Sequence, residues 1–285
     1  MLKQGPGPDS ELAYKEMKAK NVIGLSLITL AATTVIYYLL TFKQILLSDK
    51  INRRLSFSPS YCLGLSGDTN IDLPAIMDQF YDDFEVEQNR AKINIIKSQY
   101  GSIISNIAFL TNLPDSLILA FIFVESSGIV NSKNGNGIGL MQIGVNSATD
   151  IVYNEYKNGR LFQEEISILR SYLNERMDQI FSMRSPGITL YITAEDLYNP
   201  ELNILIGAIY LGQLIDESFE ADKLRLDKVI IRYNTGYFSF QRGRKLIGDI
   251  ATILNIVNPI TQAYITKMIG KNGVLETIES ENCSG

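Results

Sequence analysis

An apolar segment that ends in a carboxylate constrains the fold of this chain more than any other feature. Residues 116–126 carry a run of Leu, Ile, Phe and Val that predicts a buried helix, and Glu125 lies in its last turn. Gly128 then stops the helix, and a polar loop with Gly135 and Gly137 follows. Apolar neighbours and the negative end of the helix dipole both raise the pKa of a carboxyl group placed there. A raised pKa suits a general acid, although a solvated glutamate at a frayed helix end fits the local pattern equally well.

Composition leaves carboxylates as the main source of catalytic groups. The chain has 285 residues, no histidine, and only two cysteines, Cys62 and Cys283. This excludes a zinc site of the Cys/His type and any triad with a histidine base, so neither a metal nor a cofactor is expected. The net charge of −5 and the lack of a basic cluster argue against a nucleic-acid partner. A disulfide between the two cysteines and a pair of free thiols both stay open.

An uncharged stretch near the N-terminus predicts a membrane anchor. Residues 1–20 are polar, and residues 21–42 contain no charged side chain, which matches the ~20 residues that cross a bilayer. A buried helix of this length would usually show a polar face, and a signal peptide would have a shorter apolar core. We therefore expect an uncleaved transmembrane helix. Lysine and arginine are balanced on its two sides, so charge does not set its orientation.

The rest of the chain is expected to be a linker region followed by a mainly α domain. Residues 43–97 are interpreted as a linker and an amphipathic helix, and residues 98–285 as the functional domain. Residues 161–193 are interpreted as an insertion that forms a flap over a cleft, and residues 270–285 as a tail. Helical spacing of apolar residues predicts helices at 100–110, 116–126, 146–158, 163–181, 201–218, 226–233 and 255–269.

Four short motifs carry a resemblance to a known family. They are Glu125-Ser126, Gly-Leu-Met-Gln at residues 139–142, Tyr233-Asn234, and Tyr264 at the end of a Thr-Gln-Ala-Tyr run. In this order they resemble the soluble lytic transglycosylase domain, which has a lysozyme-like fold and cleaves the glycan strands of peptidoglycan. The resemblance implies a mainly α, lysozyme-like domain in the C-terminal part of the chain.

The resemblance also implies a role for each matching side chain. Glu125 would be the catalytic acid, and Ser126 would orient it. Met141 would form an apolar wall of the cleft, with core filling as the alternative. Buried packing is the alternative for both tyrosines, and helix capping for the asparagine. The residues expected to contact the glycan are Ser126, Met141, Gln142, Tyr233, Asn234 and Tyr264.

The implied function is that of a membrane-anchored peptidoglycan lytic transglycosylase. Its partners would be peptidoglycan strands and, through residues 21–42, a lipid membrane. Because the substrate is the cell wall, the domain would lie outside the cytoplasmic membrane, in the periplasm, or in the membrane of a phage virion. A virion and a secretion or conjugation apparatus are both compatible settings. A hydrolysing muramidase that resembles goose-type lysozyme, and an inactive glycan-binding membrane scaffold, are the alternatives.

Overall fold

The structure is a computed structural model that describes part of the chain. The described residues are 35, 71–72, 83–187, 189–220, 223–236 and 259–282. The chain forms two compact units, Met1–Asp49 and Lys50–Gly285, and only the helical Val35 is described in the first. The rest of the expected transmembrane helix at 21–42, and both cysteines, lie outside the described residues. Among the helices that are described, none is both long and apolar enough to cross a bilayer.

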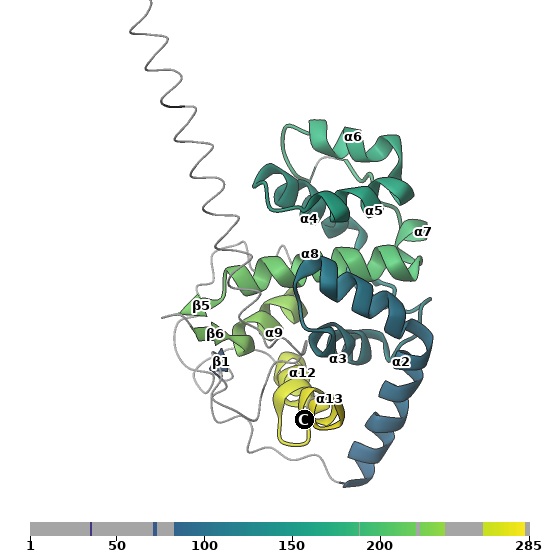
Figure 1. The fold of residues 1–285 in the computed structure, drawn as a ribbon, viewed down its shortest axis with the longest axis vertical. Coiled ribbons are helices and arrows are strands. Elements are labelled where there is room, and N and C mark those ends of the chain that lie inside the picture. The colour runs from purple at the N-terminus through teal and green to yellow at the C-terminus, as the bar shows by residue number, and fades with distance from the viewer. Residues whose placement is uncertain are drawn as a thin grey trace, which may run out of the picture. The chain divides into compact units, whose positions relative to one another are not determined.

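A long helix opens the described part of the second unit. α2 spans Asp83–Thr111 (Figure 1). Its buried face carries Ile93, Ile96, Ile104 and Ile107 at helical spacing. The boundary expected between residues 97 and 98 therefore falls inside one continuous helix. The amphipathic helix of the expected linker is the first half of α2, and its isoleucines belong to the core of the domain.

The helix that carries Glu125 lies where the sequence predicts it. α3 spans Asp115–Ser126, and all eight residues from 116 to 123 are buried. α2, α12 (Pro259–Ile269) and α13 (Val274–Asn282) pack against it, so α3 is covered by segments from both ends of the domain (Figure 1). The prediction of a buried helix at 116–126 is confirmed.

The last described helix corrects an expectation. Residues 270–285 were expected to be a tail, but α13 packs against α2 and α3. Its residues Val274, Leu275 and Ile278 are fully buried, and Glu279 accepts a hydrogen bond from Ser116 of α3 at 3.2 Å. Three apolar residues on one face are enough to dock this short helix, although acidic residues surround them in the sequence.

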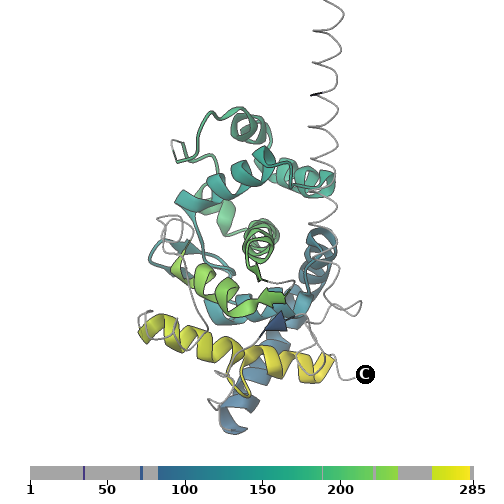
Figure 2. The same cartoon turned by 90° about the vertical axis from the view of Figure 1, so that its left-hand side faces the viewer.

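A central helix organises the remaining elements. α8 spans Pro200–Asp216, and residues 202–215 are all buried. Asn199 caps its start by accepting the Leu202 N–H at 3.0 Å, and Pro200 occupies the first turn. Figure 2 shows α8 end-on with other helices around it. Its neighbours are α2, α4 (Val145–Lys157), α5 (Gln163–Leu173), α7 (Ala194–Leu197) and α9 (Leu226–Thr235). The described residues are mainly helical, which confirms the expected α class.

Two small sheets join the helices. One is antiparallel, in the order β2 (Lys133–Asn134), β3 (Gly137–Ile138) and β4 (Ile143–Gly144). In the other, β6 (Lys223–Arg225) pairs antiparallel with β5 (Phe219–Glu220) and parallel with β1 (Ile71–Asp72). β1 comes from the expected linker and adds a strand to the domain.

The expected insertion at 161–193 forms two helices and a loop. A single helix was predicted over 163–181, but Asn174 has a φ of 50° and breaks it into α5 and α6 (Glu175–Ser182). α6 packs against α4, and the ring of Phe181 stacks on Tyr156 of α4 with centroids 3.5 Å apart.

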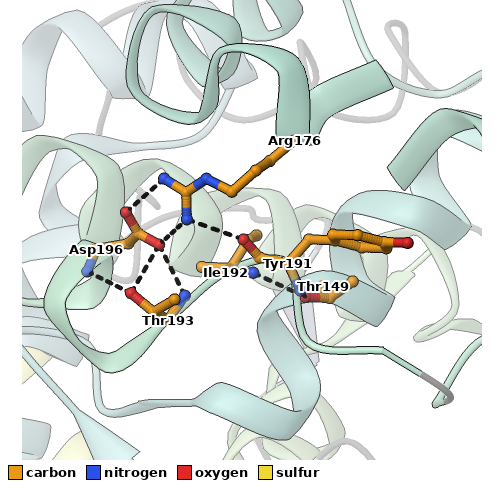
Figure 3. A network of polar contacts seen from close by, with 6 residues as sticks. All are labelled: Thr149, Arg176, Tyr191, Ile192, Thr193 and Asp196. Atoms are coloured by element: carbon orange, nitrogen blue, oxygen red, sulfur yellow. Dashed lines mark hydrogen bonds and ion pairs between the residues drawn. The ribbon is translucent and has the colours of Figure 1, made fainter. Parts of the chain in front are cut away.

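A polar network fixes the loop after α6 (Figure 3). Arg176 donates to both carboxylate oxygens of Asp196, at 2.5 and 2.9 Å, and to the carbonyl of Tyr191 at 3.0 Å. From α4, the hydroxyl of Thr149 accepts the N–H of Tyr191 at 3.0 Å and that of the next residue at 3.2 Å. The loop is thus tied to α4, α6 and α7, and its role as a flap stays a prediction.

Candidate functional site

The helix that carries Glu125 ends in a left-handed turn. Ser127 has a φ of 53° and Gly128 a φ of 79°. A Cβ at Gly128 would lie 2.5 Å from a carbon of Ile96 in α2, so only glycine allows this close approach. The turn stops α3 immediately after Ser126 and leaves the Glu125 carboxyl at the helix end.

Ser126 stabilises that helix end through backbone contacts. Its buried hydroxyl donates to the carbonyl of Ile122 at 3.1 Å and accepts the N–H of Gly128 at 3.2 Å. These bonds fix the backbone next to Glu125, and the expected role of Ser126 in orienting Glu125 stays a prediction. The expected contact of Ser126 with a glycan also stays a prediction.

The Glu125 carboxyl occupies a partly buried, poorly solvated position. Burial raises its pKa from 4.5 to about 7, although a hydrogen bond from Tyr264 and the charge of Lys267 act in the opposite direction. The Tyr264 hydroxyl donates to Oε1 of Glu125 at 2.5 Å. Glu125 is therefore neither the fully solvated residue of the alternative interpretation nor part of a closed ion pair. A carboxyl with a pKa near 7 can give and take a proton at neutral pH.

Tyr264 reaches Glu125 from α12, far away in the sequence. Its pKa is well above the ordinary range because the side chain is buried and because Glu125 is negatively charged when ionised. Tyr264 therefore stays protonated and keeps its hydrogen available for the carboxylate. The sequence motif places this tyrosine at the site, and the structure brings it to the same carboxyl group.

Tyr233 links α9 to the loop that contains the Gly-Leu-Met-Gln motif. Its buried hydroxyl donates to the carbonyl of Met141 at 2.8 Å. Its ring packs on Phe121 of α3, with centroids 4.5 Å apart, and on Tyr210 of α8, at 5.2 Å. Burial raises the pKa of Tyr233 well above its usual value, and the charge of nearby Glu125 raises it further. The expected neighbourhood of Tyr233 and Glu125 is present, with the tyrosine hydroxyl directed to the loop.

Asn234 connects α9 with α12. Its side-chain oxygen accepts a hydrogen bond from the hydroxyl of Thr261 at 2.8 Å. Thr261 precedes Tyr264 by three residues on α12, so the two side chains lie on the same helix face. Asn234 therefore helps to place the helix that presents Tyr264, and its expected glycan contact stays a prediction.

The Gly-Leu-Met-Gln loop is anchored to α8 by a buried asparagine. Asn203 accepts the Met141 N–H at 2.8 Å and donates to the carbonyls of Ile138 and Leu197, at 2.8 and 2.9 Å. Gly139 has a φ of 79°, and a Cβ there would lie 2.3 Å from the Asn203 amide. No motif in the sequence indicates Asn203, because only the fold shows that it faces the loop.

Met141 corrects a prediction about the wall of a cleft. Its side chain is fully buried, with no exposed surface, and packs against Gly207 of α8. A Cβ at Gly207 would lie 2.4 Å from the Met141 sulfur, so the missing side chain of the glycine makes the space that the thioether fills. Met141 is thus a core residue of the loop, which was the alternative interpretation.

Gln142 differs from the expected orientation toward substrate. Its amide donates to the carbonyls of Ser132, at 3.2 Å, and Gly139, at 2.8 Å, and its oxygen accepts the Asn134 N–H at 3.0 Å. Both amide hydrogens are therefore used inside the loop that closes over β2 and β3. Gln142 stabilises the loop, and the backbone φ of 49° at this residue belongs to the same tight turn.

Lys267 is a member of the site that no sequence motif indicated. Its ammonium group lies 5.0 Å from the centroid of the Phe123 ring, two residues before Glu125 on α3. Burial lowers the pKa of Lys267, the charge of Lys92 lowers it further, and Glu125 raises it. Lys267 follows Tyr264 by three positions on α12, and this spacing is the one signal that could have placed both on the same side of the helix.

Two other acidic residues, Asp115 and Asp150, lie near the motifs in the sequence, and their surroundings differ from those of Glu125. Asp115 begins α3, about 15 Å from Glu125 along the helix axis, and accepts a hydrogen bond from Ser105 at 3.4 Å. Asp150 accepts the Gly187 N–H at 2.7 Å, and burial raises its pKa. Within the described ranges, no three Asp, Glu, Cys or His residues come together as a metal site would require.

The arrangement joins an acid of near-neutral pKa, a tyrosine donor and a nearby cation at one helix end. Such a group can transfer a proton to and from a ligand that reaches the exposed part of Glu125. In comparisons with known proteins, the chain matches no family model and no curated protein. Function must therefore be inferred from these residues and from the resemblance of their motifs.

Proposed function

We propose that the chain is a peptidoglycan lytic transglycosylase with Glu125 as its acid and base. The domain would have a lysozyme-like fold, and residues 21–42 would anchor it in a membrane next to the cell wall. The catalytic domain would then lie in the periplasm or on the membrane of a virion. The observation that carries the proposal is the half-buried Glu125 carboxyl, whose pKa of about 7 fits a group that must both donate and accept a proton.

The first step is protonation of the glycosidic oxygen. Glu125 in its acid form gives its proton to the oxygen between N-acetylmuramic acid and N-acetylglucosamine, and the bond from C1 to that oxygen breaks. The leaving sugar keeps the proton as its new hydroxyl. Positive charge develops at C1 of the muramic acid, close to the carboxylate that has just formed.

The second step returns the proton to Glu125. The carboxylate accepts the hydrogen of the C6 hydroxyl of the same muramic acid, whose oxygen forms a bond to C1. The product is a 1,6-anhydro sugar, and no water is consumed. An intramolecular nucleophile has an effective molarity of up to about 10⁵–10⁸ M, which removes the need for a second carboxylate.

The surroundings of Glu125 support a mechanism with one carboxyl group. A retaining hydrolase with two carboxylates holds them about 5 Å apart, and an inverting one about 6.5–9.5 Å apart. Asp115 is at the far end of α3, and Asp150 accepts a hydrogen bond from the loop after α6. Asp115 is therefore too far from Glu125 to be the second carboxylate, and Asp150 uses one of its oxygens to hold the loop. Tyr264 would hold the carboxyl, and Asn234 and Tyr233 would keep α12 and the motif loop in place around it.

Digestion of purified peptidoglycan tests the proposal. The full chain, purified in detergent, should release fragments whose masses show anhydro ends, which are lighter than reducing ends by one water. Glu125→Gln should reduce the rate by about 10²–10⁴-fold, the usual contribution of a general acid. Glu164→Gln, at an exposed position on α5, is the matched control and should keep the wild-type rate.

The products also separate the alternatives. Reducing ends in place of anhydro ends would replace the proposal with a hydrolysing muramidase. Binding of peptidoglycan without any released fragment, in wild type and Glu125→Gln alike, would replace it with a glycan-binding scaffold.

A further inference from the structure

One face of α12 directs two different polar groups at the end of α3. Tyr264 donates its hydroxyl hydrogen to Glu125 at 2.5 Å, and Lys267 lies with its ammonium group 5.0 Å from the ring centroid of Phe123. The lysine side chain is half-buried. A cation is thus held beside the last turns of the helix that ends in Glu125.

The position of Glu125 makes a nearby cation useful. Its carboxyl lies at the C-terminal end of α3, where the helix dipole is negative, and its surroundings are poorly solvated. Both effects oppose the ionised form. Yet the proposed reaction passes through that form, because Glu125 is a carboxylate between the loss of its proton and the return of another.

We propose that Lys267 is a positioning residue for this reaction, and that its ammonium group stabilises the Glu125 carboxylate formed when the glycosidic oxygen takes the proton. The inference rests on the proposed function. Lys267 itself gives and takes no proton and forms no bond. It acts through Glu125, by making that group a stronger acid than its burial alone would allow.

The coupling between the two groups is reciprocal, as it must be. The charge of Lys267 lowers the pKa of Glu125, and the charge of Glu125 raises the pKa of Lys267. Lys92 of α2 opposes the charged form of Lys267, as does burial. The interaction can therefore be measured at either group, as a shift in the pKa of Glu125 or of Lys267.

The other groups around Glu125 do not supply this charge. From α12, Tyr264 contributes a neutral hydroxyl, and from α9, Tyr233 directs its hydroxyl to the carbonyl of Met141. From α13, Glu279 bonds to Ser116, near the opposite end of α3. Among the described groups that interact electrostatically with Glu125, Lys267 is the cation.

Direct titration of the Glu125 carboxyl tests the inference without relying on turnover. The full chain in detergent, labelled with ¹³C at glutamate side chains, is titrated by NMR, and Glu125→Gln assigns the resonance. Lys267→Met keeps the apolar stem but removes the charge, and should raise the pKa of Glu125 by about one unit. Lys267→Arg keeps the charge and should leave the pKa near its wild-type value. Lys157→Met, at an exposed position on α4, controls for the change in net charge.

The pH profile of peptidoglycan cleavage gives the second reading. Because Glu125 must start in its acid form, activity falls as pH rises through its pKa. In Lys267→Met this fall should move about one unit to higher pH. The maximal rate should drop several-fold, because a weaker acid protonates the glycosidic oxygen more slowly. Lys267→Arg should keep the wild-type pH profile and maximal rate. If Lys267 has only a structural role, Lys267→Met should lower thermal stability without shifting the pH profile.

The outcomes separate this inference from the proposed function. An unchanged Glu125 titration in Lys267→Met would overturn the role of Lys267 even if the enzyme is active. A wild-type chain that does not cleave peptidoglycan would overturn the proposed function, while the NMR titration would still decide the coupling. Should Lys267→Met not fold, Lys267→Gln supplies the same loss of charge with a polar side chain.

Discussion

Glu125 and Asp196 are both partly buried carboxylates, and their surroundings shift their pKa values in opposite directions. Glu125 at the end of α3 receives one hydroxyl hydrogen bond and has a raised pKa of about 7. Asp196 in α7 receives two bonds from Arg176 and two from Thr193, and its pKa is lowered. Burial acts to raise the pKa in both cases. The difference therefore comes from the number and charge of the partners.

The comparison contrasts a carboxylate that holds a loop in place with one whose pKa lies near neutrality. Burial alone would raise the pKa of Asp196, but the donors from Arg176 and Thr193 and the charge of the guanidinium outweigh it. With its oxygens so occupied, Asp196 is suited to hold the loop in Figure 3 and has little capacity left for a ligand. Within the part of the chain that the structure describes, Glu125 receives a hydrogen bond on Oε1 alone, so its other carboxyl oxygen is the one suited to exchange a proton.

The largest expected effect is on the pH dependence of stability at Glu125. Its pKa is about 7 in the folded chain and 4.5 unfolded, so the folded state binds the proton more tightly. The resulting stabilisation is complete below pH 4.5 and is lost as pH rises through 7. Glu125→Gln should therefore match wild type near pH 4 and be more stable by up to about 3 kcal/mol at pH 8.

Denaturant unfolding in detergent across this pH range measures the difference. Glu164→Gln serves as the exposed control, and its free energy of unfolding should decrease with rising pH as that of the wild type does. If the difference in free energy of unfolding between Glu125→Gln and wild type stays constant from pH 4 to 8, Glu125 has the same pKa in the folded and the unfolded chain. The contrast with Asp196 would then disappear.

Asp196 should show the opposite dependence with a smaller magnitude. Asp196→Asn removes the charge that pairs with Arg176 and weakens the bonds to Thr193, which should lower stability at pH 7 by about 2 kcal/mol. Because the folded pKa is depressed, wild-type Asp196 stabilises the fold above pH 3.8 and loses this effect as pH falls through its lower folded value. The difference between variant and wild type should therefore shrink in acid.

A second acidic residue provides the control for Asp196. Asp178 accepts a bond from Arg170 at 2.7 Å, but both side chains are more than half exposed. Asp178→Asn should change stability by only about 0–1 kcal/mol, as is usual for surface ion pairs. Denaturant unfolding at pH 7 measures both variants. If Asp196→Asn and Asp178→Asn lose the same free energy of unfolding, the number of partners and the burial of Asp196 do not add to its stabilising effect.

The helices of this domain could be predicted where their buried residues follow a simple pattern. The continuous apolar run before Glu125 predicts a buried helix, and Gly128 marks its end, because the approach of Ile96 requires a glycine there. The helix at 274–282 was missed, since three apolar residues among acidic ones give a weak signal before their partners on α2 and α3 are known. The continuity of α2 across residues 97 and 98 was hidden for the same reason, because Ile93 and Ile96 become core residues only once the helices around α2 pack on them.

Sequence motifs predict that Glu125 and Tyr264 lie close together, but they do not predict most of the residues that surround them. Glu125 and Tyr264 could be placed from their motifs, and they form a direct hydrogen bond. Met141 could not be placed, because its burial depends on the space left by Gly207 on another helix. The hydrogen bonds of Gln142 depend on the way its own loop folds back. Lys267 reaches the site only through the packing of α12 against α3, a tertiary contact that no local pattern encodes.

The smallest expected effect comes from the single hydrogen bond that Glu125 does receive. Tyr264→Phe removes the hydroxyl that donates to Oε1 at 2.5 Å. Because this bond favours the ionised carboxyl, its loss should raise the pKa of Glu125 above 7. Stability should fall by about 1 kcal/mol at pH 8 and by less at pH 5, where the carboxyl is already protonated.

Tyr172→Phe is the matched control, since Tyr172 also donates its hydroxyl to a carboxylate, that of Glu201 on α8. It should leave the NMR titration of Glu125 unchanged, whereas Tyr264→Phe should shift it upward. Equal losses of stability at pH 5 and pH 8 in Tyr264→Phe would mean that the hydroxyl serves packing of α12 alone. A loss of stability that grows with pH would mean that the Tyr264 hydroxyl stabilises the ionised form of Glu125. One such donor leaves the pKa of Glu125 near 7, whereas the four hydrogen bonds to Asp196 lower the pKa of that carboxyl.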